Sequence, residues 1–367
     1  GLAAANAKLE GIGFISVATT ALLIGFGVNI LLVALRKLTK VRTLFITGHI
    51  MVQQAATISV FVLILIPQLQ NSWGAWAVGI ICGLYWAVSS NMTVEPTQRL
   101  TGGGGFAIGH QQQFAIWFVD KIAPFLGKKE DNLDDLKLPS FLSIFHDTVV
   151  ASATLMLVFF GSILLVLGPE MMSNAELIGV GAYNPAKQAF FMYVIQTAFT
   201  FSVYLFILMQ GVRMFVTELT NAFQGISSKL LPGSFTAVDV AASYGFGSSN
   251  AVLSGFAFGL VGQLITIALL VIFKNPVLII TGFVPVFFDN AAIAVYADKR
   301  GGWKAAVALS FISGVLQVAL GAIAVTLLGL TGGYHGNIDL VLPWLPIGYI
   351  FKSLGVIGYG LVCLYFL

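Results

Sequence analysis

The chain has 367 residues, of which 58% are hydrophobic and 9% are charged, and its mean hydropathy is +0.94. An average soluble domain is about 25% charged, so in water this chain would expose far more apolar surface than a soluble monomer does. The formal net charge is only +3, and the Lys and Arg residues fall in short loops, so the chain has no continuous basic face for nucleic acid. The apolar composition and the basic loops together indicate an integral membrane protein.

Apolar stretches of about 20 residues recur along the chain, each long enough to cross a hydrocarbon core about 30 Å thick. Because only helices and closed barrels satisfy the backbone polar groups in lipid, we expect these stretches to be helices. Eight full spans and a ninth at the end of the sequence are predicted, at residues 12–35, 44–67, 73–91, 141–167, 188–212, 251–273, 276–297, 304–330 and 346–367. The prediction is an all-α, polytopic helical membrane protein that forms a single transporter unit over residues 1–367. The first span follows Gly1 almost at once without an initiating Met, so we expect further sequence upstream.

Two stretches, residues 95–126 and 232–250, interrupt this pattern. Each has a Pro near its start, a centre rich in Gly, and polar residues in an apolar setting; the first includes four consecutive glycines at 102–105. Irregular backbone at membrane depth is stable only where protein or a water-filled cavity surrounds it. We interpret both as re-entrant or broken helices, and such a pair in two halves of a transporter indicates the transport site.

The orientation follows from three short basic loops, at residues 36–42, 127–138 and 299–304. If both interrupted stretches are re-entrant, all three loops lie on the same side of the membrane, which the positive-inside rule assigns to the cytoplasm. An inverted repeat would instead place the two interrupted stretches at opposite faces.

His49 and Gln53 lie within the predicted span 44–67. Polar side chains inside a membrane are costly, so each one is a candidate functional residue. The two are four positions apart, which places both on one helical face. Histidine and glutamine both donate and accept hydrogen bonds, as a ligand rich in hydroxyl and carbonyl groups requires. The alternative is an ordinary hydrogen-bonded pair between helices, worth about 0.6 kcal/mol on average.

His110 and Gln111 directly follow the glycine run, and the next polar residues are Gln112 and Gln113. If a half-helix begins here, its free N–H groups and the positive end of its dipole face the cavity, where they attract an anion or an oxygen-rich solute. The glycine run itself is not a phosphate loop, because no Lys-Ser or Lys-Thr follows it. We predict that His110 and Gln111 contact the ligand and that the next two glutamines turn toward other protein groups.

Asp239 is a single carboxylate in an otherwise apolar stretch, so it must be paired, protonated or in contact with water. We interpret it as a substrate or coupling group; the alternative is an internal partner such as Arg213. Arg213 with Glu218, and the acidic residues Asp147 and Asp289, fit structural or capping roles better.

The sequence predicts neither a catalytic residue nor a cofactor or metal. It has no metal-ligand cluster at a known spacing, no credible Ser/His/Asp arrangement, and no cysteine in a water-exposed loop that a partner could phosphorylate. Cys82 and Cys363 lie in apolar stretches without a partner motif and are expected to be small buried hydrophobic residues.

Five strings of the sequence together resemble one family over nearly the whole chain. They are T-G-H-I-M-V-Q-Q at 47–54, S-N-M at 90–92, G-F-A-I-G-H-Q-Q-Q-F at 105–114, A-P-F-L-G-K-K-E at 123–130 and Q-G-V-R-M-F at 210–215. The family is the membrane-spanning IIC component of the bacterial L-ascorbate phosphotransferase system.

The resemblance implies a homodimer in the bacterial inner membrane, in which each protomer has a dimerising scaffold and a mobile core that carries L-ascorbate in an elevator-like step. A soluble IIB partner with a phosphocysteine then phosphorylates the vitamin, and a IIA partner recharges IIB, so phosphoryl transfer takes place outside this chain. On the matching motif positions, the family's substrate contacts fall on Gln53, His110, Gln111 and Asp239, with His49 close by. Members of the family carry further hydrophobic sequence, including substrate contacts, ahead of the region matched here.

Two alternatives remain open. One is a proton- or sodium-coupled secondary transporter of a small organic anion, with Asp239 as the coupling group; the other is a channel or a structural membrane subunit. Because ascorbate is a monoanion, a carboxylate beside it is expected to face the hydroxyl groups of its tail or to be protonated.

Overall fold

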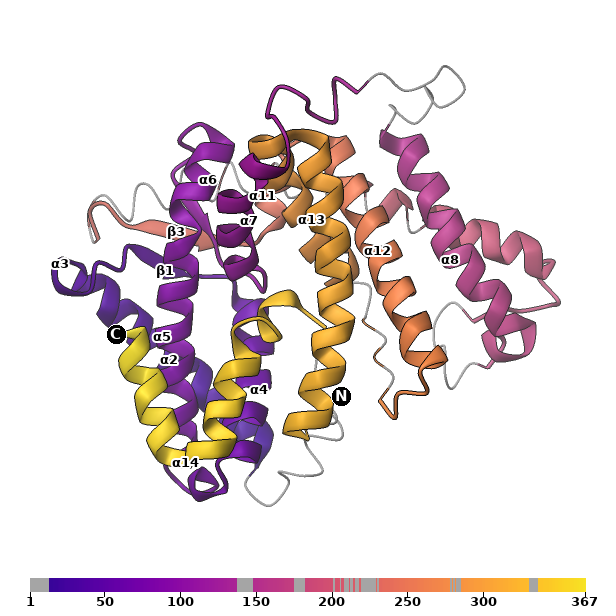
Figure 1. Ribbon diagram of the computed structural model, residues 1–367. Coiled ribbons are helices and arrows are strands. Elements are labelled where there is room, and N and C mark those ends of the chain that lie inside the picture. Colours follow the sequence, from indigo (N-terminus) through magenta and orange to yellow (C-terminus); the bar gives the residue numbers. More distant parts are fainter. Residues whose placement is uncertain are drawn as a thin grey trace. The chain divides into compact units, whose positions relative to one another are not determined.

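The computed structural model describes residues 13–136, 148–174, 182–200, 231–277, 285–329 and 336–367, together with isolated positions between 202 and 229 and at 279 and 281. Arg213 and Asp147 lie outside the described residues. The chain divides into two compact units: residues 1–133 with 216–367, and residues 134–215. Figure 1 shows the elements of each.

The helices of the larger unit account for most of its residues. They are α2 (Phe14–Ala34), α3 (Arg36–Thr39), α4 (Gly48–Leu65), α5 (Gly74–Met92), α6 (Val94–Thr101), α7 (Gln113–Leu126), α11 (Ala241–Tyr244), α12 (Ser249–Ile272), α13 (Asn290–Leu328) and α14 (Trp344–Phe366), with short turns η2 (Pro67–Leu69), η4 (Pro285–Asp289) and η5 (Ile338–Leu340).

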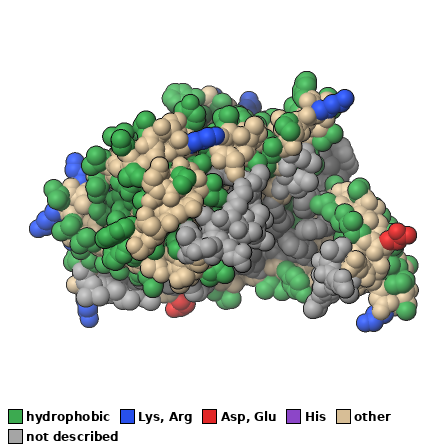
Figure 2. All heavy atoms as spheres, turned by 90° about the horizontal axis from the view of Figure 1, so that it is seen from below, with side chains coloured by type: hydrophobic (Ala, Val, Ile, Leu, Met, Phe, Trp, Pro, Cys, Tyr) green, Lys and Arg blue, Asp and Glu red, His purple; other side chains and the backbone are tan. Residues whose placement is uncertain are grey.

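Six helices among the described residues are long and apolar enough to cross a membrane, and they lie in the regions of α2, α4, α5, α12, α13 and α14. The prediction of a polytopic helical membrane protein is confirmed. Large apolar side chains are exposed on these helices, for example Leu23 at 66% and Ile357 at 73%, which fits a surface that faces lipid tails. In Figure 2, hydrophobic side chains cover much of the face shown, and Lys and Arg side chains stand mostly at its outline.

Two of the predicted spans differ from continuous helices. Within the predicted span 276–297, the π-helical turn η4 starts at Pro285 and leads into α13, which breaks at Gly302 (φ 69°, ψ −168°); residues 278, 280 and 282–284 lie outside the described part of the chain. Similarly, α14 breaks at Gly355 (φ 55°, ψ −131°), and Figure 1 shows its two limbs folding back on one another. Glycine adopts positive φ without steric cost. The break at Gly302 falls in the basic loop 299–304 predicted between two spans, whereas the break at Gly355 lies inside the predicted apolar span 346–367, where the hydropathy pattern does not reveal it.

Three short strands form a parallel sheet, which the sequence analysis did not predict. They are β1 (Thr43–Phe45), β2 (Phe106–Ile108) and β3 (Phe235–Val238), in the order β1-β3-β2. Phe45 pairs with Ala237, and Ile108 pairs with Val238. The pairing satisfies backbone groups of extended segments that are buried in the protein, as at Phe45, Ala107 and Ala237.

Both interrupted stretches contain one of these strands. The stretch 95–126 runs from α6 through the glycine run into β2 and then α7. The glycines at 102, 103 and 105 have φ values of 67°, 99° and 75°, which other residues rarely adopt. The stretch 232–250 consists of β3, the short helix α11 and the start of α12.

Ion pairs link two of the basic loops, 36–42 and 299–304, and a backbone hydrogen bond of 2.8 Å from the N–H of Trp303 to the carbonyl oxygen of Asp131 joins the third, 127–138. Arg42 Nη2 lies 3.5 Å from Glu95 Oε1, and Arg99 Nη1 lies 4.0 Å from Glu95 Oε2. Arg99 also binds the buried Asp120 in a bidentate pair, with Nε 3.1 Å from Oδ1 and Nη2 2.5 Å from Oδ2. Arg300 Nε lies 3.3 Å from Asp120 Oδ1. The prediction that these loops share one side of the protein is therefore consistent with the structure.

An aromatic core packs behind the sheet on α4, α5 and α14. The ring centroids of Phe45 and Trp86 are 5.7 Å apart, those of Phe61 and Trp344 are 5.5 Å apart, and those of Tyr85 and Trp344 are 5.3 Å apart. All five side chains are essentially inaccessible to solvent. Such a core holds β1 and α5 in fixed positions relative to one another.

The smaller unit contains α8 (Thr148–Met172), which breaks at Gly168, and a shorter apolar helix over Phe190–Tyr204. The predicted spans 141–167 and 188–212 fall here, although residues 141–147 lie outside the described part of the chain. Tyr183 packs against Phe190 and Tyr193, with centroid distances of 5.1 and 5.3 Å.

The close approach of β2 to β3 predicts that Gly109→Ala destabilises the protein. A Cβ atom at Gly109 would lie 2.8 Å from the carbonyl oxygen of Ala237, whereas a Cβ at Gly27 in α2 would meet nothing within 4 Å. We expect Gly109→Ala to lower the free energy of unfolding by about 1–3 kcal/mol and Gly27→Ala to leave it nearly unchanged. Thermal unfolding of the purified variants in detergent measures the difference. Equal melting temperatures would show that the strands are not so closely packed.

Candidate functional site

The carboxyl ends of the three parallel strands bring the predicted polar residues to one edge of the sheet. β1 leads into the first turn of α4, which carries His49; β3 leads directly into Asp239; and β2 leads through Gly109 into His110. Because parallel strands end at the same edge, residues from three distant parts of the sequence become neighbours.

Asp239 lies between two histidines. His49 Nε2 is 3.0 Å from Asp239 Oδ2, and His110 Nε2 is 4.0 Å from the same oxygen. The other carboxylate oxygen accepts a hydrogen bond of 2.8 Å from the backbone N–H of Ala241. The His49 side chain is 68% exposed and that of His110 only 3%, so the carboxylate has one accessible and one buried imidazole beside it.

The hydrogen bonds of Gln112 fix the protonated nitrogen of His110. Gln112 Oε1 accepts a 2.8 Å bond from the backbone N–H of Gln111 and lies 2.6 Å from His110 Nδ1. A backbone N–H can only donate, so this glutamine atom is the oxygen, and His110 Nδ1 must carry the hydrogen. In its neutral form, His110 therefore presents the lone pair of Nε2 toward Asp239.

His110 and Asp239 both lie in connections outside the six apolar helices named above. Burial lowers the pKa of His110 below its ordinary value, so its neutral form dominates at pH 7. Burial alone would raise the pKa of Asp239, but the hydrogen bond from His49 and the nearby His110 lower it below its ordinary value. Asp239 is therefore ionised at neutral pH, which favours contact with hydroxyl groups over the protonated alternative.

A glutamine network extends the site from Asp239 toward α4. Gln111 Nε2 donates to Gln53 Oε1 at 2.7 Å, and Gln54 Nε2 donates to the carbonyl oxygen of His110 at 2.8 Å. Trp86 Nε1 in turn donates to Gln54 Oε1 at 2.6 Å. Gln111 is 2% exposed, yet its Oε1 has no hydrogen-bond partner among the described residues. A buried acceptor without a partner is costly, and the hydroxyl group of a ligand would satisfy it.

The fold thus brings together all five residues proposed from the sequence: His49, Gln53, His110, Gln111 and Asp239. It also brings together three possible metal ligands, since the donor atoms of His49, His110 and Asp239 lie within 4.8 Å of one another. Their separation along the sequence gave no sign of such a cluster.

The amino end of α7 is not free to bind an anion, contrary to the expectation from the sequence. The backbone N–H groups of Phe114 and Ala115 donate to the carboxylate of Asp339 at 3.0 and 3.2 Å, and Tyr85 Oη lies 3.3 Å from the same group. Asp339 is fully buried. Its negative charge occupies the position at which an anionic solute would have been stabilised by the helix dipole. The backbone N–H of Asp339 also donates to the carbonyl oxygen of Gln111 at 3.1 Å.

Asp339 was not predicted to be a functional residue, because it lies in the loop between two predicted spans. The sequence feature that could have indicated a buried carboxylate is the pair of apolar residues that directly follows it, Leu340 and Val341. Asp289 has the structural role expected of it. Its carboxylate accepts hydrogen bonds from Ile338 N at 2.7 Å, Gln317 Nε2 at 3.0 Å and Asn337 Nδ2 at 3.1 Å.

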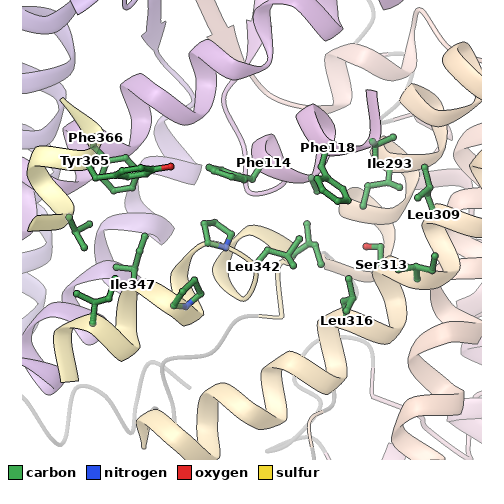
Figure 3. Close-up of a pocket in the computed structure, with 18 of the residues that line it drawn as sticks. Phe114, Phe118, Ile293, Leu309, Ser313, Leu316, Leu342, Ile347, Tyr365 and Phe366 are labelled. Carbon is green, nitrogen blue, oxygen red and sulfur yellow. The ribbon is translucent and has the colours of Figure 1, made fainter. Parts of the chain in front are cut away.

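An apolar cavity of about 800 Å³ lies between α7, α13 and α14. Figure 3 shows Phe114 and Phe118 on one side of it and Leu342 and Leu316 on the other, with the hydroxyl of Ser313 near one end. None of the five site residues lines this cavity. Because its walls offer a polar solute almost no hydrogen-bond partners, we assign the solute site to the sheet edge instead.

Comparison with known proteins connects this arrangement to sugar transport. Residues 2–339 match the family EIIC-GAT, described as the sugar-specific permease component of the PTS system. The chain is also 36% identical over 334 residues to the ascorbate-specific PTS system EIIC component of Mycoplasma pneumoniae, an alignment that covers 83% of this chain and 50% of that protein. The chain therefore spans about half the length of this relative.

The cap on α7 predicts that Asp339→Ala is strongly destabilising and that Asp339→Asn is less so. The alanine leaves two buried N–H groups without an acceptor, at a cost of about 1–3 kcal/mol each, whereas asparagine retains one acceptor oxygen. Glu130→Ala is the matched control, because this acid is exposed and its ion pair with the exposed Lys129 is long, at 4.0 Å. Thermal unfolding in detergent should rank the variants in this order. A melting temperature of Asp339→Ala equal to that of the control would contradict the capping role.

Proposed function

Because this chain belongs to the EIIC-GAT family, the sugar-specific permease component of phosphotransferase systems, we propose that it carries L-ascorbate across the bacterial inner membrane as a multi-pass transporter. The ascorbate-specific component of Mycoplasma pneumoniae supports this choice of substrate. A soluble IIB partner carrying a phosphocysteine phosphorylates the arriving substrate, and a IIA partner recharges IIB. The chain itself needs no catalytic residue and no cofactor.

The observation that carries the proposal is the convergence of five polar side chains at the carboxyl edge of the sheet. Asp239, His110 Nε2 and Gln111 Oε1 present acceptors, and the last of these has no partner among the residues that the structure describes. Such a set suits the hydroxyl groups of the ascorbate tail, which can donate to each of them.

The anionic ring of ascorbate belongs at the more accessible end of the site. His49 is exposed and can donate, and Gln53 on the same face of α4 offers an amide group. The negative charge of Asp239 is partly balanced by its hydrogen bond from His49, which reduces its repulsion of the ring. With Asp339 on the end of α7, side chains rather than a helix dipole bind the anion.

Translocation follows from the family assignment. We propose that two copies form a homodimer through a scaffold, and that a core containing residues 95–126 and 232–250 moves the bound solute between the two faces of the membrane in an elevator-like step. The three linked basic loops lie on the cytoplasmic side under this proposal, where IIB approaches.

Reconstituted vesicles test the proposed function directly. We expect uptake of labelled ascorbate to require IIA, phosphorylated IIB and the intact chain, and to yield ascorbate phosphate inside the vesicle. Vesicles with an imposed pH or sodium gradient but no IIB should show no accumulation. Accumulation of unmodified ascorbate in those vesicles would instead support the alternative, a proton- or sodium-coupled secondary transporter of a small organic anion with Asp239 as its coupling group.

Substitutions at Asp239 test its role as a hydroxyl acceptor. Asp239→Ala removes both acceptor oxygens and should weaken ascorbate binding about 10- to 100-fold, the equivalent of about 1.5–3 kcal/mol for hydrogen bonds to a charged group. Asp239→Asn keeps one acceptor and should lose less. Equilibrium binding to purified protein, with Glu130→Gln as an exposed acidic control, provides the comparison. Equal losses in the Ala and Asn variants would argue against hydroxyl acceptance.

A further inference from the structure

We propose that His49, His110 and Asp239 also bind a divalent first-row transition-metal ion, with Zn²⁺ as the expected occupant, and that the ion blocks the solute site. The three donor atoms lie within 4.8 Å of one another and come from α4 and from the ends of β2 and β3. Only the competition with ascorbate rests on the proposed function; metal binding itself does not.

The first argument concerns the state of the donors. The hydrogen bond of His110 Nδ1 to Gln112 leaves the Nε2 lone pair directed toward the cluster. Metal-binding histidines in proteins almost always have their other ring nitrogen held by a hydrogen bond of this kind. The buried imidazole is thus oriented as a ligand before any ion arrives.

The second argument is the unfavourable pairing of His110 with Asp239. The lone pair of His110 Nε2 and the carboxylate oxygen Oδ2 are both acceptors, and they lie 4.0 Å apart with no hydrogen between them. A cation or a donor between these atoms would convert repulsion into attraction. The unpartnered Oε1 of Gln111, a residue 2% exposed, is a second sign that this part of the site is built to take a ligand.

The third argument is that the geometry and chemistry suit zinc. Zinc lies about 2.0–2.1 Å from His nitrogen and carboxylate oxygen, so its ligand atoms in a tetrahedral site are about 3.4 Å apart. Shifts of about 1 Å or less would bring the separations of 3.0 and 4.0 Å close to this value, and the exposed His49 can move most easily. On binding, His49 Nε2 gives up its hydrogen, which passes to Nδ1 or to solvent. Three protein ligands leave a fourth position for water.

Two imidazoles and one carboxylate are also a donor set that favours zinc and related ions over Mg²⁺ or Ca²⁺, which prefer oxygen ligands. An ion here would occupy the same atoms as the hydroxyl groups of the solute. We therefore expect competitive inhibition by zinc, with no requirement for zinc in transport.

Calorimetric titration of the purified, chelator-treated full-length chain with ZnCl₂ alone tests the site without reference to ascorbate. We expect one saturable ion per protomer, and Co²⁺ should give the visible absorption of a tetrahedral complex. His110→Gln and His49→Gln should each weaken binding at least about tenfold. Glu130→Gln is the control, because this exposed acid is not among the three residues of the cluster, and the variant should bind zinc like the original protein.

Titration with calcium under the same conditions should show no saturable binding. If the elution profile of His110→Gln shows that this variant does not fold, His49→Gln still tests the site, because His49 is exposed and its substitution disturbs no buried packing. Undiminished zinc binding in a folded His49→Gln or His110→Gln variant would overturn the proposed site. Ascorbate binding that is unaffected by saturating zinc would overturn the competition. Failure of the vesicle assay above would reject the ascorbate assignment and leave the calorimetric result intact.

Discussion

The structure depends on one constraint, which is that extended backbone buried in the protein must find hydrogen-bond partners. Three extended segments meet this requirement by pairing with one another, with β3 between β1 and β2. Because the three strands are parallel, the residues that follow them meet at one edge of the sheet, and this edge is where the candidate site lies. His49, His110 and Asp239 become neighbours for this reason, although they are far apart in the sequence and lie in separate apolar stretches. The chemistry of the site is therefore a consequence of how backbone polarity is satisfied.

The three carboxylates near the sheet edge and α7 have different roles. Asp339 is used entirely within the protein, since it caps α7 and accepts from Tyr85, and Asp289 holds the backbone at Ile338. Asp239, by contrast, is partly accessible and has a lone pair rather than a donor facing it from His110. Asp339 thus compensates the positive end of α7, and in the proposed function recognition of the solute falls to neutral side chains and to one ionised acid. Such a site selects its ligand by the positions of hydroxyl groups more than by net charge.

Polar residues in apolar stretches were the strongest signal in the sequence. They predicted a site made of His49, Gln53, His110, Gln111 and Asp239, and the fold brings these five side chains together. The interruption at 95–126 was predictable as well, because the glycine run marks it. The three strands were not, because each is only three or four residues long and is stabilised by pairing with distant segments. The break at Gly302 falls in the predicted basic loop 299–304, whereas the break at Gly355 was hidden because the limbs on either side of it are equally apolar. Asp339 was missed because its partners, the N–H groups of α7, are more than 200 positions away.

The strand order also has a consequence for biosynthesis. The central strand is the last of the three to be translated, so β1 and β2 have no strand to pair with until residue 238 has been made. About 130 residues separate the end of β2 from the end of β3, and at typical elongation rates this delay is on the order of ten seconds. During that time the nascent chain must keep two unpaired extended segments away from lipid, held by the insertion machinery or at the aqueous boundary. Membrane integration of this fold is therefore expected to be completed late, when β3 emerges from the ribosome, and not span by span.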